Sequence, residues 1–203
     1  MIKVLAGDEI KQILYSVIDD ISKEKIQTEI TSDIKSSQKY IDIIMSKCIR
    51  KLYYESNDDM DDDYYYFYGR IVATLSEALL HFMLTICTLP SERKIAIKND
   101  LHLDLVIPSL QNLKTKPEKS IIVQIIKEKL ELNTIPQLEF LQPNYKNIWL
   151  IFGRPLTTTT KYTTYYVLPN AGPYNNYSDI IIDIDNFLRE TGDKSFRLIH
   201  SLG

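Results

Sequence analysis

Apolar residues recur every three to four positions through the first part of the chain, which is the period of amphipathic helices. Asp8 is a candidate N-cap for a first helix, whose apolar stripe continues to Ile21. The same period predicts a second helix over about residues 37–54 and a third over about residues 63–87. Residues 27–32, between the first two helices, are interpreted as extended chain or loop.

The period changes from 3.6 to 2 after Pro90, which predicts strands in place of helices. The predicted strands cover residues 93–98, 101–107, 120–127, 147–152 and 163–168. The run at 120–127 is almost continuously β-branched, as is typical of a central strand buried on both faces. The other segments are a basic polar connection at 111–119, a partly helical segment at 128–144, a turn at 169–173, a strand or the start of a helix at 179–184, and a short helical turn at 187–190.

This order of elements predicts an α/β protein in which a mixed sheet, between residues 93 and 184, packs against the third helix. An acidic run at 55–63 interrupts the pattern, and we interpret it as a solvated linker. Residues 1–58 would then form a helical segment that caps the core or mediates dimerisation, and residues 63–203 would form the α/β core domain.

The composition excludes several classes of protein. The chain has 203 residues, 44% of them hydrophobic, which suits one globular core. No uninterrupted apolar run reaches the roughly 18 residues of a membrane span, and the first residues are charged too early for a signal peptide. We therefore expect a cytoplasmic protein without a membrane partner. Cys48 and Cys87 lie in apolar helical patterns and are expected to be buried free thiols.

The charge is unevenly distributed along the chain. The net charge is −3, but residues 64–161 carry 12 Lys or Arg against eight Asp or Glu. This mildly basic block permits contacts with phosphate groups. Lys114 and Lys116 in the basic connection, and Arg154 in the turn after the fourth strand, are the candidate nucleic-acid contacts.

Residues 63–152 follow the order helix, strand, strand, strand, helix, strand, with Asp104 inside the second strand. This αβββαβ order resembles the restriction-endonuclease-like superfamily, whose motif is PD-(D/E)XK and whose small members include the archaeal Holliday-junction resolvases. The resemblance implies that Asp104 is a metal ligand, that Glu77 is the helical glutamate of the family, and that residues 123–127 form the motif strand.

The resemblance also implies a chemistry. In this superfamily an Asp and a second acid hold Mg²⁺, and a Lys two residues after the second acid helps to activate water. Here Gln124 stands at the place of the second acid and Ile126 at the place of the lysine, while Lys127 falls on the opposite face of the strand from Gln124. The implied catalytic set is Asp104, Gln124 and Lys127, with Glu77 and Asp104 as metal ligands, and this set is degenerate.

We therefore expect a nuclease-like domain that has lost or altered its catalytic motif and binds nucleic acid or a protein partner, with Mg²⁺ as cofactor only if the chain is an enzyme. Two alternatives stay open. One is an active metal-dependent endonuclease of the resolvase type, in which a β-bulge turns Lys127 inward. The other is a protein-interaction or scaffold module unrelated to nucleic acid, and the acidic N-terminal helices suit a protein partner or a homo-oligomer.

Overall fold

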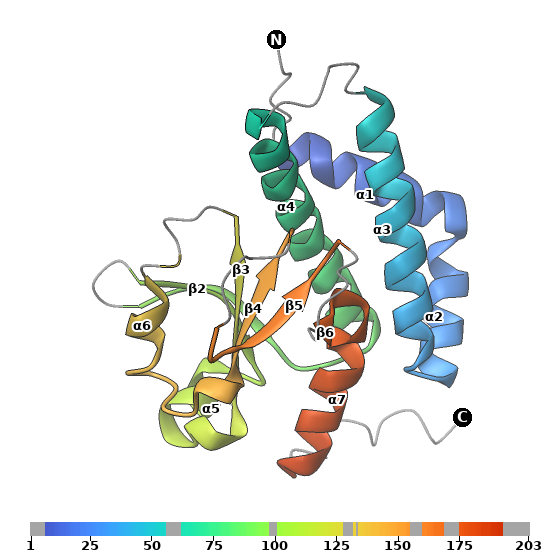
Figure 1. Cartoon of the computed structure of the whole chain (residues 1–203). Coiled ribbons are helices and arrows are strands. Elements are labelled where there is room, and N and C mark those ends of the chain that lie inside the picture. Colours follow the sequence, from blue (N-terminus) through green and yellow to red (C-terminus); the bar gives the residue numbers. More distant parts are fainter. Residues whose placement is uncertain are drawn as a thin grey trace.

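A mixed sheet occupies the centre of the molecule, with its strands in the order in which they follow along the chain (Figure 1). The structure is a computed structural model that describes residues 7–55, 62–97, 101–127, 132, 134–154, 160–168 and 175–192, without the side chains of 53–55 and 62–67. The strands are β1 (Glu92–Ala96), β2 (His102–Ile107), β3 (Ile121–Ile126), β4 (Ile148–Phe152), β5 (Thr163–Tyr166) and β6 (Asn175–Asn176). The first three strands pair antiparallel, and β3 to β6 pair parallel. The predicted mixed α/β class is confirmed.

Helices cover both faces of this sheet. They are α1 (Gly7–Ile21), α2 (Lys23–Ser32), α3 (Ser36–Glu55), α4 (Asp62–Ile86), α5 (Leu110–Thr115), α6 (Ile135–Leu138) and α7 (Ile180–Glu190). Short 3-10 turns η1 (Pro117–Lys119), η3 (Tyr145–Asn147) and η4 (Tyr177–Asp179) complete the connections. Figure 1 shows α4 between the sheet and the layer of α1 to α3, with α5 and α6 on the other side of the sheet. The result is a three-layer arrangement of helices, sheet and helices.

The alternation of side chains along the central strands explains why both faces are covered. In β3, Val123 and Ile125 belong to the core formed with α1 to α4 and α7, whereas Ile122 and Ile126 belong to the core under α5 and α6. Successive residues of a strand point to opposite faces, so a strand that is apolar at nearly every position must be buried twice. The continuous apolar run predicted for a central strand is therefore confirmed at β3.

Two local predictions and the predicted extent of the sheet need correction. Residues 27–32, interpreted as loop or extended chain, lie in α2, where Ile26 and Ile30 are buried one turn apart and the Ser22 side chain caps the N-terminus. Residues 179–184, predicted as a strand or the start of a helix, belong mainly to α7, so the helical alternative is confirmed and the sheet ends at β6 instead of residue 184. The polar connection at 111–119 contains α5, which Ser109 caps by accepting a hydrogen bond from the backbone of Asn112. Of these helices, α2 and α5 are short or polar, and their side-chain caps supply what periodicity alone does not show. Residues 56–61 of the predicted acidic linker and the predicted turn at 169–173 lie outside the described residues.

The third predicted helix is confirmed as α4, and it is long and apolar for a reason. By length and composition alone its segment Tyr68–Ile86 is able to cross a membrane, but 61% of that segment is buried inside the molecule. It lies between the sheet and α1, so apolar residues face protein on more than one side. A helix in the middle of a three-layer core has the same composition as a membrane helix because both lack contact with water.

The N-terminal helices share their core with the sheet. The buried residues of α1, among them Leu14 and Val17, lie in one hydrophobic cluster with Leu75 and Leu79 of α4. We predict that a chain without residues 1–58 aggregates, because the side of α4 that α1 and α3 cover becomes exposed. Size-exclusion chromatography with light scattering measures this directly. A soluble, folded monomer of residues 59–203 would instead show that the N-terminal segment is a separate unit.

Candidate functional site

Strands β2 and β3 pair only at one end and separate at Asp104. Their antiparallel register runs from Ile107↔Ile121 to Leu105↔Val123 and then stops, although both strands continue. The Asp104 carboxylate lies in the opening, where its Oδ2 accepts a hydrogen bond from the backbone N of Ile125 at 2.8 Å. A side-chain oxygen thus takes the place of the carbonyl that a regular ladder would offer.

The side chain of Gln124 fills the same opening from the other strand. Its Oε1 accepts a hydrogen bond from the backbone N of Asp104, and its Nε2 donates to the carbonyl of His102, both at 3.3 Å. Asp104 and Gln124, two of the predicted site residues, are therefore brought together. Each of the two side chains forms hydrogen bonds with the backbone of the other strand. These bonds explain why a partly buried Asp is tolerated among Leu, Val and Ile.

The sheet is also irregular on the outer side of Asp104. Lys94 of β1 lies between the pairs Arg93↔Leu105 and Ile95↔Leu103, and its φ of 51° is in the left-handed region. Leu103 and Leu105 belong to cores on opposite faces of the sheet, although regular alternation would place them on the same face. The backbone therefore turns at Asp104, and this turn opens the space between β2 and β3.

Glu77 of α4 and Lys127, at the carboxyl end of β3, form an ion pair. Lys127 Nζ lies 2.6 Å from Glu77 Oε2, with the Glu77 side chain only 12% exposed. His81, one helical turn after Glu77, has its Nε2 3.9 Å from Glu77 Oε1, a distance too long for a hydrogen bond. His81 and Lys127 beside it lower the pKa of Glu77 to about 2, so the carboxylate is ionised at neutral pH.

The two faces of β3 determine which of its residues lie beside Glu77. Ile125 and the ion pair of Lys127 lie on the side of the sheet that α4 covers, and Gln124 lies on the other side. The prediction that Gln124 and Lys127 point to opposite faces agrees with this arrangement. On the α4 side, however, the residue two positions before Lys127 is Ile125. The structure thus offers a second alignment, with Ile125 and Lys127 at the places of the acid and the lysine, beside the sequence-based one with Gln124 and Ile126.

Arg154 lies at the same end of the sheet as the ion pair of Glu77 and Lys127, whereas Lys114 and Lys116 do not. Arg154 follows the carboxyl end of β4 and lies along α4, where a Cβ added to Gly69 would be 3.3 Å from its Cδ. Lys114 and Lys116 belong to α5 and its C-cap, beyond the opposite ends of the strands (Figure 1). The three predicted nucleic-acid contacts therefore divide between two ends of the molecule.

The described residues at the carboxyl ends of the strands do not form the ligand set that Mg²⁺ prefers. Mg²⁺ takes oxygen ligands in octahedral geometry, usually one or two carboxylates with waters or phosphates. The Glu77 carboxylate is paired with the Lys127 ammonium, and one oxygen of Asp104 accepts the hydrogen bond from Ile125. Within the part of the chain that the structure describes, no three His, Cys, Asp or Glu side chains are grouped to hold a metal ion.

Sequence reasoning missed His81. Its two ring nitrogens are buried, and neither makes a hydrogen bond to a described residue. The available signal was its position four residues after Glu77, since residues i and i+4 share one face of a helix.

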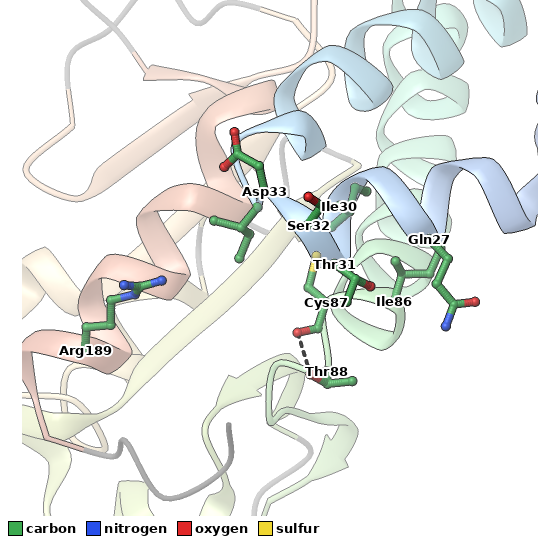
Figure 2. A pocket seen from close by; sticks show the side chains of 10 residues that line it. Gln27, Ile30, Thr31, Ser32, Asp33, Ile86, Cys87, Thr88 and Arg189 are labelled. Carbon is green, nitrogen blue, oxygen red and sulfur yellow. Dashed lines mark hydrogen bonds between the residues drawn. The ribbon is translucent and has the colours of Figure 1, made fainter. Parts of the chain in front are cut away.

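A separate pocket lies among the helices, away from these residues. Its volume is about 330 Å³, and its lining comes from α2, the end of α4 and α7, including Asp33, Cys87 and Arg189 (Figure 2). Figure 2 shows the Asp33 carboxylate pointing away from Arg189, and Arg189 is held by Asp185. Charged groups therefore do not converge on a common point in this pocket. The prediction of free thiols is confirmed for both cysteines, although Cys48 is buried and Cys87 only partly so.

Comparisons with known proteins place the fold. No protein-family model and no curated protein matches the chain. The chain is similar to metal-depleted Ecl18kI in complex with uncleaved, modified DNA, with a TM-score of 0.56 and 11% sequence identity over 95% of this chain and 88% of that chain. A second structure, metal-depleted Ecl18kI in complex with uncleaved DNA, has a TM-score of 0.47 at the same identity and coverage. The fold is restriction-endonuclease-like, as the order of elements predicted.

Proposed function

We propose that this chain is a DNA-binding domain built on a restriction-endonuclease-like fold, with an incomplete hydrolytic site. The observation that carries the proposal is the structural similarity to a restriction endonuclease that is bound to DNA. Two positively charged side chains, Lys127 and Arg154, lie where parallel strands end under α4. Ligands of open α/β sheets commonly bind at the carboxyl ends of the strands.

Two features support an incomplete hydrolytic site. The apolar, buried Ile125 stands two residues before Lys127, at the spacing that the motif gives its second acid and its lysine. The acid of the helix, Glu77, is neutralised by the lysine that would otherwise act on water. Loss of one group that stabilises charge in the transition state typically costs a factor of about 10² to 10³ in rate.

A second candidate, an active metal-dependent nuclease, is favoured by one observation. Lys127 lies on the α4 side of β3 together with the ionised Glu77. If bound DNA drew Lys127 toward a phosphate, the Glu77 carboxylate would be released at the same end of the sheet as Asp104. The two candidates therefore differ in whether two carboxylates become available in the complex with DNA.

Binding is tested by fluorescence anisotropy with a labelled duplex of about 30 base pairs at several salt concentrations. We expect affinity that falls with salt, because phosphate contacts release counterions. Arg154→Gln should weaken duplex binding severalfold and reduce the salt dependence. Lys39→Gln is the matched control, because Lys39 of α3 pairs with Glu29 of α2, in the helical layer that is separated from the sheet by α4. Absence of duplex binding at about 50 mM salt would refute the proposal.

Cleavage is tested on the same duplex, and on single-stranded and branched DNA, with Mg²⁺ or Mn²⁺. We expect no cutting. Metal-dependent cutting that Asp104→Ala abolishes, in a protein that keeps its circular dichroism spectrum, would establish the active nuclease instead. Cutting that persists in Asp104→Ala would indicate a contaminating nuclease and would leave the binding result to decide.

A further inference from the structure

The segment after α6 exposes two aromatic side chains to solvent. Phe140 is 89% exposed and Tyr145 is 42% exposed. Among the described residues, only Tyr15 of α1 is a further large hydrophobic side chain with comparable exposure. Two of three such rings thus lie within six residues of one another, while the neighbouring Leu138 is buried in the core under the sheet.

The backbone that carries these rings is fixed by polar contacts. The side chain of Gln142 is fully buried, and its Nε2 donates to the carbonyls of Pro117 and Ser120 at 2.6 and 2.7 Å. Its Oε1 accepts from the backbone N of Asn144. The carbonyl of Lys146 accepts hydrogen bonds from the Trp149 indole and the Thr163 hydroxyl. A ring on a fixed segment loses little conformational entropy when it binds a partner.

Four lysines lie on the segments next to the rings. The contacts of Gln142 join the Phe140 segment to η1, directly after Lys114 in the last turn of α5 and Lys116 at its C-cap, and Figure 1 shows these segments side by side below the strands. Lys146 and Lys161 lie on the adjoining side, and all four lysines are exposed. The nearby acids among the described residues are Glu118 and Glu139, and Glu139 is held by Lys161 and the Tyr162 hydroxyl. Four lysines against these two acids leave the surface locally positive in a chain with a net charge of −3.

We infer that this aromatic–lysine surface, formed by Phe140, Tyr145, Lys114, Lys116, Lys146 and Lys161, binds single-stranded nucleic acid. Unpaired bases stack on exposed aromatic rings, and ammonium groups follow the phosphodiester backbone. A protein partner is the weaker fit. Each ring offers at most about 250 Å², whereas a stable protein interface buries about 800 Å² on each partner and depletes lysine at its centre.

This surface is separate from the site proposed above. It lies where β3 and β4 begin, whereas Asp104, Lys127 and Arg154 lie toward the carboxyl ends of the same strands. The inference therefore does not depend on duplex binding, and the two surfaces are tested by different nucleic acids.

The experiment compares labelled oligo(dT) and oligo(rU) of about 12 nucleotides with the duplex, by anisotropy at about 50 mM salt. The wild-type chain should bind the single strands, and Phe140→Ala should weaken this binding by about tenfold, since stacking contributes on the order of 1–3 kcal/mol per base. Affinity for the duplex should stay unchanged. Tyr15→Ala is the matched control, because Tyr15 is 56% exposed on α1, in a different layer of the molecule.

Three results would overturn the inference. The first is that the wild-type chain does not bind the single strands, and the second is that wild type and Phe140→Ala bind them equally. The third is that Phe140→Ala changes the sedimentation of the protein but not its affinity for the oligonucleotides, which would identify a surface for self-association. Phe140→Ala is expected to fold normally because the ring is exposed, and its thermal unfolding curve verifies this. Loss of duplex binding alone would contradict only the proposed function.

Discussion

Replacing Gly153 by alanine is expected to destabilise the protein severely. A Cβ at this position would lie 2.2 Å from the carbonyl oxygen of Gly69 and 3.1 Å from the backbone N of Ala73. Both contacts are with the backbone of α4, so no side chain can rotate away, and the helix must move away from β4. Overpacking in a core typically costs about 1–3 kcal/mol and more when backbone must shift. We expect a loss of roughly 3 kcal/mol or more in the free energy of unfolding, measured by urea denaturation.

Gly69→Ala is the matched control for this effect. Its added Cβ would meet only the Arg154 side chain, at 3.3 Å from Cδ, and that chain is flexible. Alanine in a helix interior is favoured over glycine by about 0.5–1 kcal/mol, which offsets a small adjustment of Arg154. We therefore expect a change near zero. Equal stability of the two variants would mean that α4 and the end of β4 are not in backbone contact.

The close contact between Gly153 and α4 also sets the positions of the candidate site residues. Glu77 comes from the helix, while Lys127 and Arg154 follow two strands, so the ion pair and the arginine are positioned by the distance between α4 and the sheet. A sequence cannot reveal this distance. It showed a glycine after a predicted strand, which is also the usual signal of a turn.

The elements with strong periodicity were predictable from the sequence, and so was their order. The helix at 63–87 and the strand at 120–127 each bury enough apolar surface for the pattern to be unambiguous. The segments at 27–32 and 111–119 were not, because α2 and α5 bury few residues and depend on the caps at Ser22 and Ser109. The fold class survived these errors because it follows from the long elements.

The candidate residues were predictable individually but not in their alignment. Asp104 was singled out as a carboxylate in an apolar strand, and it is indeed held by a contact that crosses to β3. The sequence could not decide which residues of β3 correspond to the acid and the lysine of the motif, because the ion pair of Lys127 with Glu77 of α4 has no local signal. The exposed position of Phe140 was equally hidden, because an apolar residue beside Leu138 and Leu141 has no local signal that it faces water.

The ion pair between Glu77 and Lys127 should make the protein sensitive to acid. His81 and Lys127 beside it together lower the pKa of Glu77 from 4.5 to about 2 in the folded chain, so the folded state favours the charged carboxylate. The resulting stability is fully present above pH 4.5 and is lost as the pH falls toward 2. A difference of this size corresponds to about 2 kcal/mol lost by pH 3. Because the Glu77 side chain is only 12% exposed, water and salt screen the pair weakly.

The prediction is measured as the free energy of unfolding from pH 6 to pH 3, for the wild type and for Glu77→Gln. The variant should be less stable than the wild type at pH 6, because Lys127 keeps its charge and loses its partner. Its stability should fall less between pH 6 and pH 3, so the two curves should converge. Glu29→Gln is the control, since Glu29 forms a similar pair with Lys39 at 3.2 Å on an exposed surface, and its curve should stay close to that of the wild type. Parallel curves for the wild type and Glu77→Gln would show that neither His81 nor Lys127 stabilises the charged Glu77 carboxylate in solution. In that case the carboxylate and the Lys127 ammonium would both be available to a metal ion or a phosphate without a partner having to separate them, and the active-nuclease candidate would gain support.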